Sequence, residues 1–69
     1  MSTVYFTFEP REDLRASLLS DFPEVDFEFS LGIDEAKLSK AEVLVTYGED
    51  LKEHHLTKAE KLEWIFVAS

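Results

Sequence analysis

The segment AEVLVTYGEDLKEHHLTKAEKLEWIFVAS, residues 41–69, decides the fold because two apolar runs in it are separated by a polar stretch of helix length. The first run is Val43-Leu44-Val45, and the second extends from Trp64 to Ala68. Short runs of β-branched and aromatic residues are typical of strands buried on both faces of a parallel sheet. Between them, Asp50 as N-cap with Glu53 three positions later has capping-box spacing and predicts a helix. The segment therefore predicts a β-α-β unit.

The preceding residues show the same alternation of strand and helix. Residues 3–9, TVYFTFE, predict a strand, and a helix is expected over residues 10–21 because Pro10 favours a first helical turn. Residues 25–31 alternate between apolar and polar side chains, which indicates an edge strand with one solvated face. Residues 32–40 form a connection in which a helical turn around residues 34–38 stays open. The inward-facing residues expected on the first helix are Leu14, Leu18, Leu19 and Phe22.

This order of elements predicts an α/β fold with a parallel sheet and flanking helices. Helix-length connections between parallel strands are right-handed crossovers, which leads to the flavodoxin-like strand order. Residues 25–31 would lie outermost, residues 3–9 beside them, and the two later strands would extend the sheet the other way. The last strand would then need a further neighbour. We therefore expect about four strands and two to three helices, forming the first part of a longer protein.

Composition restricts the classes of partner. The chain has 69 residues, which allow one domain with a small core, and 7 basic against 15 acidic residues give a net charge of -8. This charge repels phosphate backbones and anionic lipids, so we expect neither nucleic acid nor a membrane as partner. The chain contains no Cys, which excludes disulfides and thiolate metal sites. No apolar stretch approaches the roughly 20 residues that span a bilayer, and a cytoplasmic protein is expected.

Few residues qualify as catalytic or metal-binding groups. His54 and His55 are adjacent, so on a helix their side chains diverge by about 100°, which argues against one shared metal ion and favours solvated histidines. Acidic residues follow the first strand, where a phosphoacceptor domain holds magnesium. That fold also requires an Asp after the third strand, where Thr46-Tyr47-Gly48 stands instead. The acids at positions 9, 12 and 13 are therefore interpreted as helix-capping residues.

The chain also lacks a nucleotide-binding loop. Gly32 and Gly48 are its only glycines, so neither a dinucleotide-binding nor a P-loop motif is present. No Ser/His/Asp or Cys/His set appears in a supporting motif. The residues themselves predict no catalytic group, no cofactor site and no metal site in this chain.

Residues 41–69 resemble the N-terminal region of the D-isomer-specific 2-hydroxyacid dehydrogenases. In that family a strand of the type "advlvt" is followed by a helix, then "lkwI", then a strand leading into a turn of small residues; residues 3–40 fit the pattern in outline. The resemblance implies that residues 1–69 are the N-terminal segment of a flavodoxin-like substrate-binding domain. It also implies a Rossmann domain that binds NAD or NADP and is absent from this chain.

The resemblance also implies a location for the substrate. The family's catalytic Arg, Glu and His lie downstream of the matched region, so the segment alone would be inert although its parent is an oxidoreductase. The carboxylate of the 2-hydroxy or 2-keto acid is held by a turn of the type S-x-G, of which Ser69 would be the first residue. Tyr47 and Gly48 resemble a segment that faces the same cleft. The resemblance therefore implies Tyr47, Gly48 and Ser69 as substrate-binding residues.

A second hypothesis stays open. The chain could be a small acidic α/β module without enzymatic activity that binds a protein partner through an open sheet edge. Under either hypothesis, the apolar run at residues 64–68 predicts that the 69-residue chain self-associates by edge pairing or strand exchange.

Overall fold

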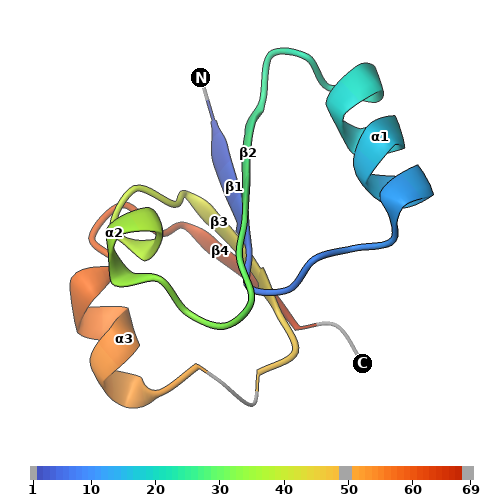
Figure 1. The fold of residues 1–69 in the computed structure, drawn as a ribbon. Coiled ribbons are helices and arrows are strands. Elements are labelled where there is room, and N and C mark those ends of the chain that lie inside the picture. Colours follow the sequence, from blue (N-terminus) through green and yellow to red (C-terminus); the bar gives the residue numbers. More distant parts are fainter. Residues whose placement is uncertain (1, 49–50, 68–69) are drawn as a thin grey trace.

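A computed structural model describes residues 2–48 and 51–67 of the chain (Figure 1). Strands and helices alternate in the order β1 (Thr3–Phe6), α1 (Glu12–Asp21), β2 (Asp26–Phe29), α2 (Glu35–Leu38), β3 (Val43–Thr46), α3 (Glu53–Lys58) and β4 (Trp64–Val67). The helical turn that the sequence left open at residues 34–38 is thus α2. It forms because the side chain of Asp34 accepts hydrogen bonds from the backbone N–H groups of Ala36 (2.9 Å) and Lys37 (3.3 Å).

The four strands form one parallel sheet in the order β2-β1-β3-β4. This order confirms the predicted flavodoxin-like arrangement, with the alternating strand β2 at one edge. In register, Val4 lies opposite Phe27 on β2 and Val43 on β3, and Val43 lies opposite Trp64 on β4. The carboxyl ends of all four strands therefore point to the same side of the molecule.

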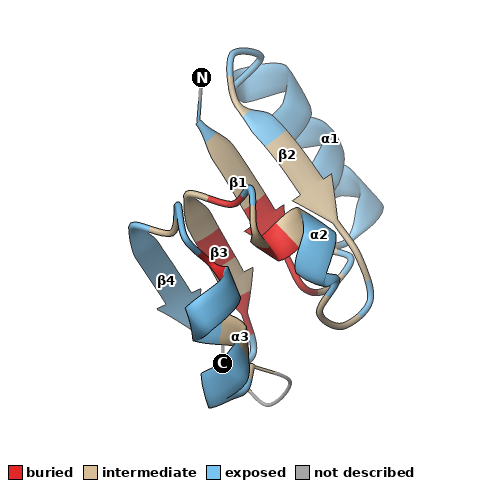
Figure 2. Cartoon of the chain, turned by 90° about the vertical axis from the view of Figure 1, so that its left-hand side faces the viewer, coloured by how far each residue is buried: buried red, intermediate tan, exposed pale blue. Residues whose placement is uncertain are grey.

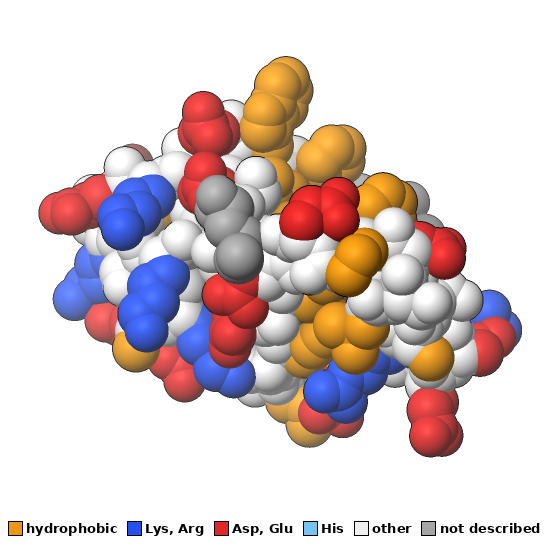
Figure 3. All heavy atoms as spheres, turned by 90° about the horizontal axis from the view of Figure 1, so that it is seen from above, with side chains coloured by type: hydrophobic (Ala, Val, Ile, Leu, Met, Phe, Trp, Pro, Cys, Tyr) orange, Lys and Arg blue, Asp and Glu red, His pale blue; other side chains and the backbone are white. Residues whose placement is uncertain are grey.

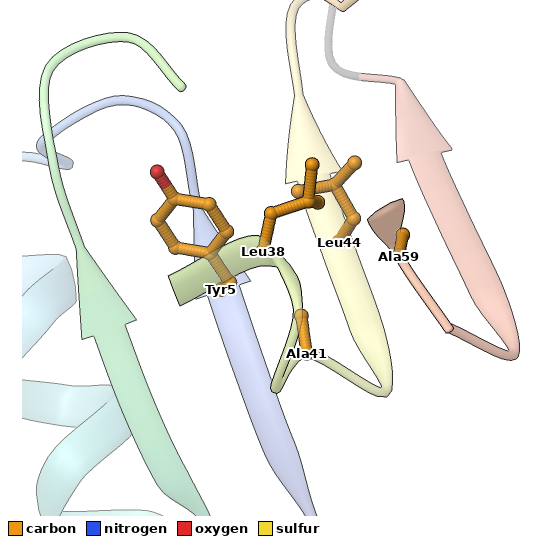
Figure 4. Close-up of a cluster of buried hydrophobic side chains, with 5 residues drawn as sticks. All are labelled: Tyr5, Leu38, Ala41, Leu44 and Ala59. Atoms are coloured by element: carbon orange, nitrogen blue, oxygen red, sulfur yellow. The ribbon is translucent and has the colours of Figure 1, made fainter. Parts of the chain in front are cut away.

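Helices α2 and α3 cover one face of the sheet, where the core lies (Figure 4). The buried apolar side chains of this cluster come from the central strands, from α2 and from the segments that end α2 and α3: Tyr5, Leu38, Ala41, Leu44 and Ala59. Tyr5 is fully buried, yet its hydroxyl is satisfied. It accepts a hydrogen bond from the backbone N–H of Asp34 (2.8 Å), donates to the carbonyl of Gly32 (3.1 Å) and contacts the hydroxyl of Ser30. This network ties the start of α2 to β1.

The opposite face of the sheet is apolar and only partly covered, because α1 does not lie over it in the way that the sequence predicts. Helix α1 lies on this side next to β2 (Figure 1), and the Arg15 guanidinium stands 4.8 Å from the centre of the Phe29 ring. The predicted inward stripe is not buried, because Leu14, Leu19 and Phe22 are each nearly half exposed. The side chains that the register places on this face are Val4, Phe6, Phe27, Phe29, Val43, Val45, Trp64 and Phe66.

The last strand has an apolar run typical of a strand buried on both faces, but it is exposed, which agrees with the expectation that it needs a further neighbour. All four residues of β4 are exposed (Figure 2), with Trp64 at 65%, Ile65 at 41%, Phe66 at 58% and Val67 at 63%. The physical reason is that β4 has one neighbour, β3, among the residues described. A run of apolar residues indicates that a strand favours burial, but the strand is buried only where another element covers it.

The predicted start of the helix before β4 is also wrong. Helix α3 begins at Glu53 and has Lys52 as its N-cap, while Asp50 lies outside the described residues. The ring nitrogen Nδ1 of His55 accepts a hydrogen bond from the backbone N–H of Lys52 (2.9 Å), which takes the place of the expected acidic cap. Among residues 2–48 and 51–67, no helix is long and apolar enough to cross a membrane.

Candidate functional site

The residues that follow the strands at their carboxyl ends form the carboxyl rim, which we define as Thr7, Phe8, Thr46, Tyr47, Gly48 and Val67. Thr7 and Phe8 follow β1, Tyr47 and Gly48 follow β3, and Thr46 and Val67 are the last residues of β3 and β4. Thr46 pairs with Val67 in the parallel register. In open α/β sheets, ligands bind beyond the carboxyl ends of the strands, so this rim is the candidate binding site.

Tyr47 presents both an aromatic face and a phenol at the rim. Its side chain is 54% exposed. The Phe8 ring lies with its centre 4.4 Å from that of Tyr47, and Phe8 in turn packs edge-on against Phe6 at 5.6 Å. The aromatic side chains that follow β1 therefore support Tyr47, which gives its ring a defined position while it stays accessible.

Gly48 holds a backbone conformation that favours glycine. Its φ is +92°, in the left-handed region, and its backbone N–H donates a hydrogen bond to the Thr46 hydroxyl (3.0 Å). A Cβ added at this position would lie 3.4 Å from Cγ1 of Val67. The loop after β3 thus lies against the end of β4. Of the three residues implied as substrate-binding, Tyr47 and Gly48 lie at the rim, and Ser69 lies outside the described residues.

Thr7 is a rim residue that the sequence analysis missed. Its side chain is only 3% exposed, and its hydroxyl is the one buried side-chain polar atom without a hydrogen-bond partner in the part of the chain that the structure describes. Its backbone is fully engaged, since its N–H donates to the carbonyl of Val45 (3.0 Å) and its carbonyl accepts from Gly32 (2.9 Å).

An unpaired buried hydroxyl lowers the free energy of unfolding by about 1–3 kcal/mol, so the Thr7 hydroxyl destabilises the fold. If the register of the Phe6–Val45 pair is continued by one residue, Thr7 lies beside Thr46 at the rim. A threonine directly after an apolar strand, at the end of the sheet where ligands bind, was the signal that could have identified it.

The groups of the rim are suited to binding a small polar or aromatic ligand. The rim offers an aromatic face, a phenol, threonine hydroxyls and backbone groups. No enclosed pocket forms among residues 2–48 and 51–67, so the rim is an open surface that can serve as one wall of a cleft.

A second cluster joins α2 to α3 and contains possible metal ligands. Glu35, His54 and His55 each offer one ligand atom, and these atoms lie within 4.8 Å of one another. The two imidazole rings are 4.1 Å apart, so the prediction that adjacent helical histidines diverge is wrong here.

Two of the three groups in this cluster, His55 and Glu35, already have partners. Nδ1 of His55 accepts the Lys52 N–H, which leaves the proton of the neutral ring on Nε2, the nitrogen that a metal ion would need. The Glu35 carboxylate pairs with the Lys58 ammonium at 3.1 Å. Its pKa is lowered, first by the hydrogen bond from Lys58. The cluster acts as a helix cap and an ion pair, and no metal site is assigned to it.

Two of the three acids interpreted as helix-capping residues lie in the helix, whereas Glu9 precedes it and the N-cap, Arg11, makes no side-chain cap hydrogen bond. Glu12 and Asp13 lie in the first turn of α1. Asp13 accepts a hydrogen bond from the backbone N–H of Leu14 (2.9 Å) and lies 3.6 Å from the Arg11 guanidinium. Carboxylates in this position complement the positive end of a helix dipole.

Comparisons with known proteins leave the family open. The chain gives no match with protein-family models, with curated proteins or with solved structures.

Proposed function

We propose that residues 1–69 are the N-terminal segment of the substrate-binding domain of a cytoplasmic NAD(P)-dependent D-2-hydroxyacid dehydrogenase. The observation that carries the proposal is the position of Tyr47 and Gly48 at the carboxyl rim, beside the end of β4. The strand order β2-β1-β3-β4 supports it, because this is the flavodoxin-like order that the resemblance implies.

In this proposal the segment binds the substrate, and the rest of the enzyme performs the chemistry. The nicotinamide cofactor would supply or accept the hydride, and a His and an Arg of the downstream part would exchange the hydroxyl proton and hold the carboxylate. The described rim residues offer none of these groups. Tyr47 contributes its phenol and aromatic face to the wall of the substrate cleft, and Ser69 would begin the turn that binds the carboxylate.

The cofactor, NAD or NADP, would bind to a separate Rossmann domain. The two glycines of this chain cannot make a dinucleotide-binding loop. Changes at the rim should therefore alter the affinity for the acid and leave the affinity for the nicotinamide cofactor unchanged.

The proposal is tested on the product of the whole reading frame that encodes these residues. We expect it to oxidise NADH or NADPH only when a 2-keto acid from a panel of short-chain acids is present, which absorbance measures directly. The 69-residue chain alone should show no such activity. A full-length product that oxidises neither cofactor with any acid of the panel would refute the proposal.

Tyr47 provides a sharper test within the same enzyme. Tyr47→Ala should raise the KM for the 2-keto acid several-fold because it removes the phenol and the ring, while the cofactor Kd, measured by fluorescence titration, stays the same. Tyr47→Phe is the matched control, which keeps the ring contact with Phe8. An unaltered KM, or an equal loss of cofactor binding, would remove Tyr47 from the substrate site.

A second candidate function is that of an acidic α/β module that binds a protein partner. One observation favours it: the exposed edge strand β4 offers a place where an added strand can pair. In this case the full reading frame would encode no keto-acid-dependent activity, so the same assay separates the two candidates.

A further inference from the structure

The contact between Phe8 and Tyr47 spans the place where the chain changes the direction in which it builds the sheet. Phe8 follows β1, from which the chain continues to β2 at one edge of the sheet. Tyr47 follows β3, from which the chain continues to β4 on the other side. Ligands of open α/β sheets bind beyond the carboxyl ends of the strands at such a switch point. Strands β1 and β3 each have a neighbour on both sides, so this position does not depend on what lies beyond β4.

Tyr47 stands at the end of a row of packed aromatic rings. The centre of the Phe8 ring lies 4.4 Å from that of Tyr47 and 5.6 Å from that of Phe6. Phe6 in turn stacks on Phe29, with 5.2 Å between the ring centres. Phe6 is buried, which anchors the row in the sheet, whereas Tyr47 is exposed. The Tyr47 ring is therefore held in place by its neighbours while a large part of its surface stays accessible.

The charge at the carboxyl rim is unfavourable for a dicarboxylic acid. The rim residues carry no charged side chain, and Glu9, which follows Phe8 along the chain, is exposed. A second carboxylate would therefore meet no cation among the rim residues, and the net charge of -8 would repel it. The rim favours an acid whose side chain is uncharged.

We propose that the keto acid bound at the carboxyl rim carries an aromatic side chain, which stacks on the Tyr47 ring. This inference rests on the proposed function, because it names the substrate class of the same site. The carboxylate of the acid would be held beyond β4, at the turn that begins with Ser69. Strand β3 is the neighbour of β4, and neighbouring strands lie about 4.7–4.9 Å apart, so the side chain of an acid held there can reach Tyr47.

An aromatic ring gains more from this surface than a methyl group does. Stacked or edge-on aromatic pairs contribute free energy beyond the area that they bury, which corresponds to about 2- to 13-fold in affinity. The apolar area that the added ring buries increases this preference. We therefore expect kcat/KM for phenylpyruvate to exceed that for pyruvate by on the order of tenfold or more, and that for oxaloacetate to be the lowest of the three.

Steady-state kinetics of the full-length protein with these three acids, at saturating cofactor, test the proposal. Tyr47→Leu keeps an apolar side chain but removes the ring, so it should lower the ratio of kcat/KM for phenylpyruvate to that for pyruvate by about 2- to 13-fold. Tyr47→Phe keeps the ring and should keep the ratio. Phe22→Leu removes an exposed ring at the end of α1 and is the matched control, in which the ratio should not change. The cofactor Kd, measured by fluorescence titration, verifies that each variant is folded.

Two inhibitors separate binding of the side chain from the chemical step. Oxamate and N-phenyloxamate are keto acid analogues that are not reduced, and they differ by one phenyl group, so the ratio of their Ki values measures the binding of the ring. We expect N-phenyloxamate to bind more tightly than oxamate to the wild type. Tyr47→Leu should reduce this difference by the same factor as in the kinetics, and Tyr47→Phe should preserve it.

The outcomes distinguish this inference from the proposed function. A wild type that prefers pyruvate or oxaloacetate, or a Tyr47→Leu variant with unchanged ratios of kcat/KM and of Ki, would overturn the aromatic substrate class, while the reduction of keto acids as such would stand. A full-length protein that reduces none of the keto acids would overturn both.

Discussion

At the scale of the residue, Thr7 is the clearest exception to the rule that buried polar groups are paired. Its hydroxyl has no partner, whereas that of Thr46 on the neighbouring strand accepts the Gly48 N–H. Thr7 and Thr46 lie side by side at the rim. The hydrogen bond from Gly48 gives the Thr46 hydroxyl a structural role, and no such bond does so for Thr7. This contrast gives a test of what Thr7 contributes to stability.

Thr7→Val should raise the free energy of unfolding by about 1 kcal/mol, because it replaces an unsatisfied buried hydroxyl with a methyl group of the same shape. Thr46→Val should lower it by about 1 kcal/mol, because the Gly48 N–H loses its acceptor. Urea denaturation of the 69-residue chain at low concentration measures both. A loss of stability in Thr7→Val as large as that in Thr46→Val would show that the Thr7 hydroxyl is hydrogen-bonded after all.

At the scale of the element, α2 and α3 are joined across the covered face by an ion pair. The pKa of Glu35 lies below its usual value, and the largest cause is the hydrogen bond from the Lys58 ammonium. A carboxyl group whose pKa is lower in the folded chain than in the unfolded chain stabilises the fold above its unfolded pKa. That contribution disappears as the pH falls through the folded pKa.

Glu35→Gln should therefore reduce stability at neutral pH and have no effect at a pH well below 4.5, the unperturbed pKa. The change should be small because both side chains are about half exposed. Thermal unfolding of the wild type and the variant across this pH range measures the difference. Glu24→Gln, an exposed acid outside the helices, is the control. A stability difference between Glu35→Gln and wild type that persists unchanged into acid would contradict this assignment.

The elements also show what the sequence could predict. The alternation of strand and helix depends on local periodicity, and it correctly predicted the parallel order and the solvated edge strand β2. Burial depends on which elements meet in space. The sequence therefore predicted the apolar character of Phe22 but not its exposure, and it could not reveal that α1 lies away from most of the sheet.

The same limit applies to the site. The resemblance implied Tyr47 and Gly48, and the parallel order of the strands places their loop at the rim because neighbouring parallel strands end side by side. Thr7 was missed because an unsatisfied hydroxyl becomes visible only once its surroundings are known. The contact between the His54 and His55 rings likewise depends on rotamers that helical spacing does not fix.

At the scale of the whole molecule, one face of the sheet is covered by α2 and α3, and the other is only partly covered. On the surface seen in Figure 3, apolar side chains project between acidic and basic groups, so the excess of acidic residues does not form a continuous acidic face in this view. The exposed side chains of β4 adjoin the partly covered face. The carboxyl rim and β4 are thus the two places where aromatic side chains are most accessible.

The measurement that tests the central claim most directly is a map of amide chemical-shift changes in the full-length protein on addition of oxamate, a 2-keto acid analogue that is not reduced. We predict that, within residues 1–69, the largest changes occur at the carboxyl rim, at Phe8, Tyr47 and Gly48, with the α2 and α3 amides unchanged. Saturable changes confined to α2, α3 or the outer edge of β4, or none anywhere in these residues, would contradict the account.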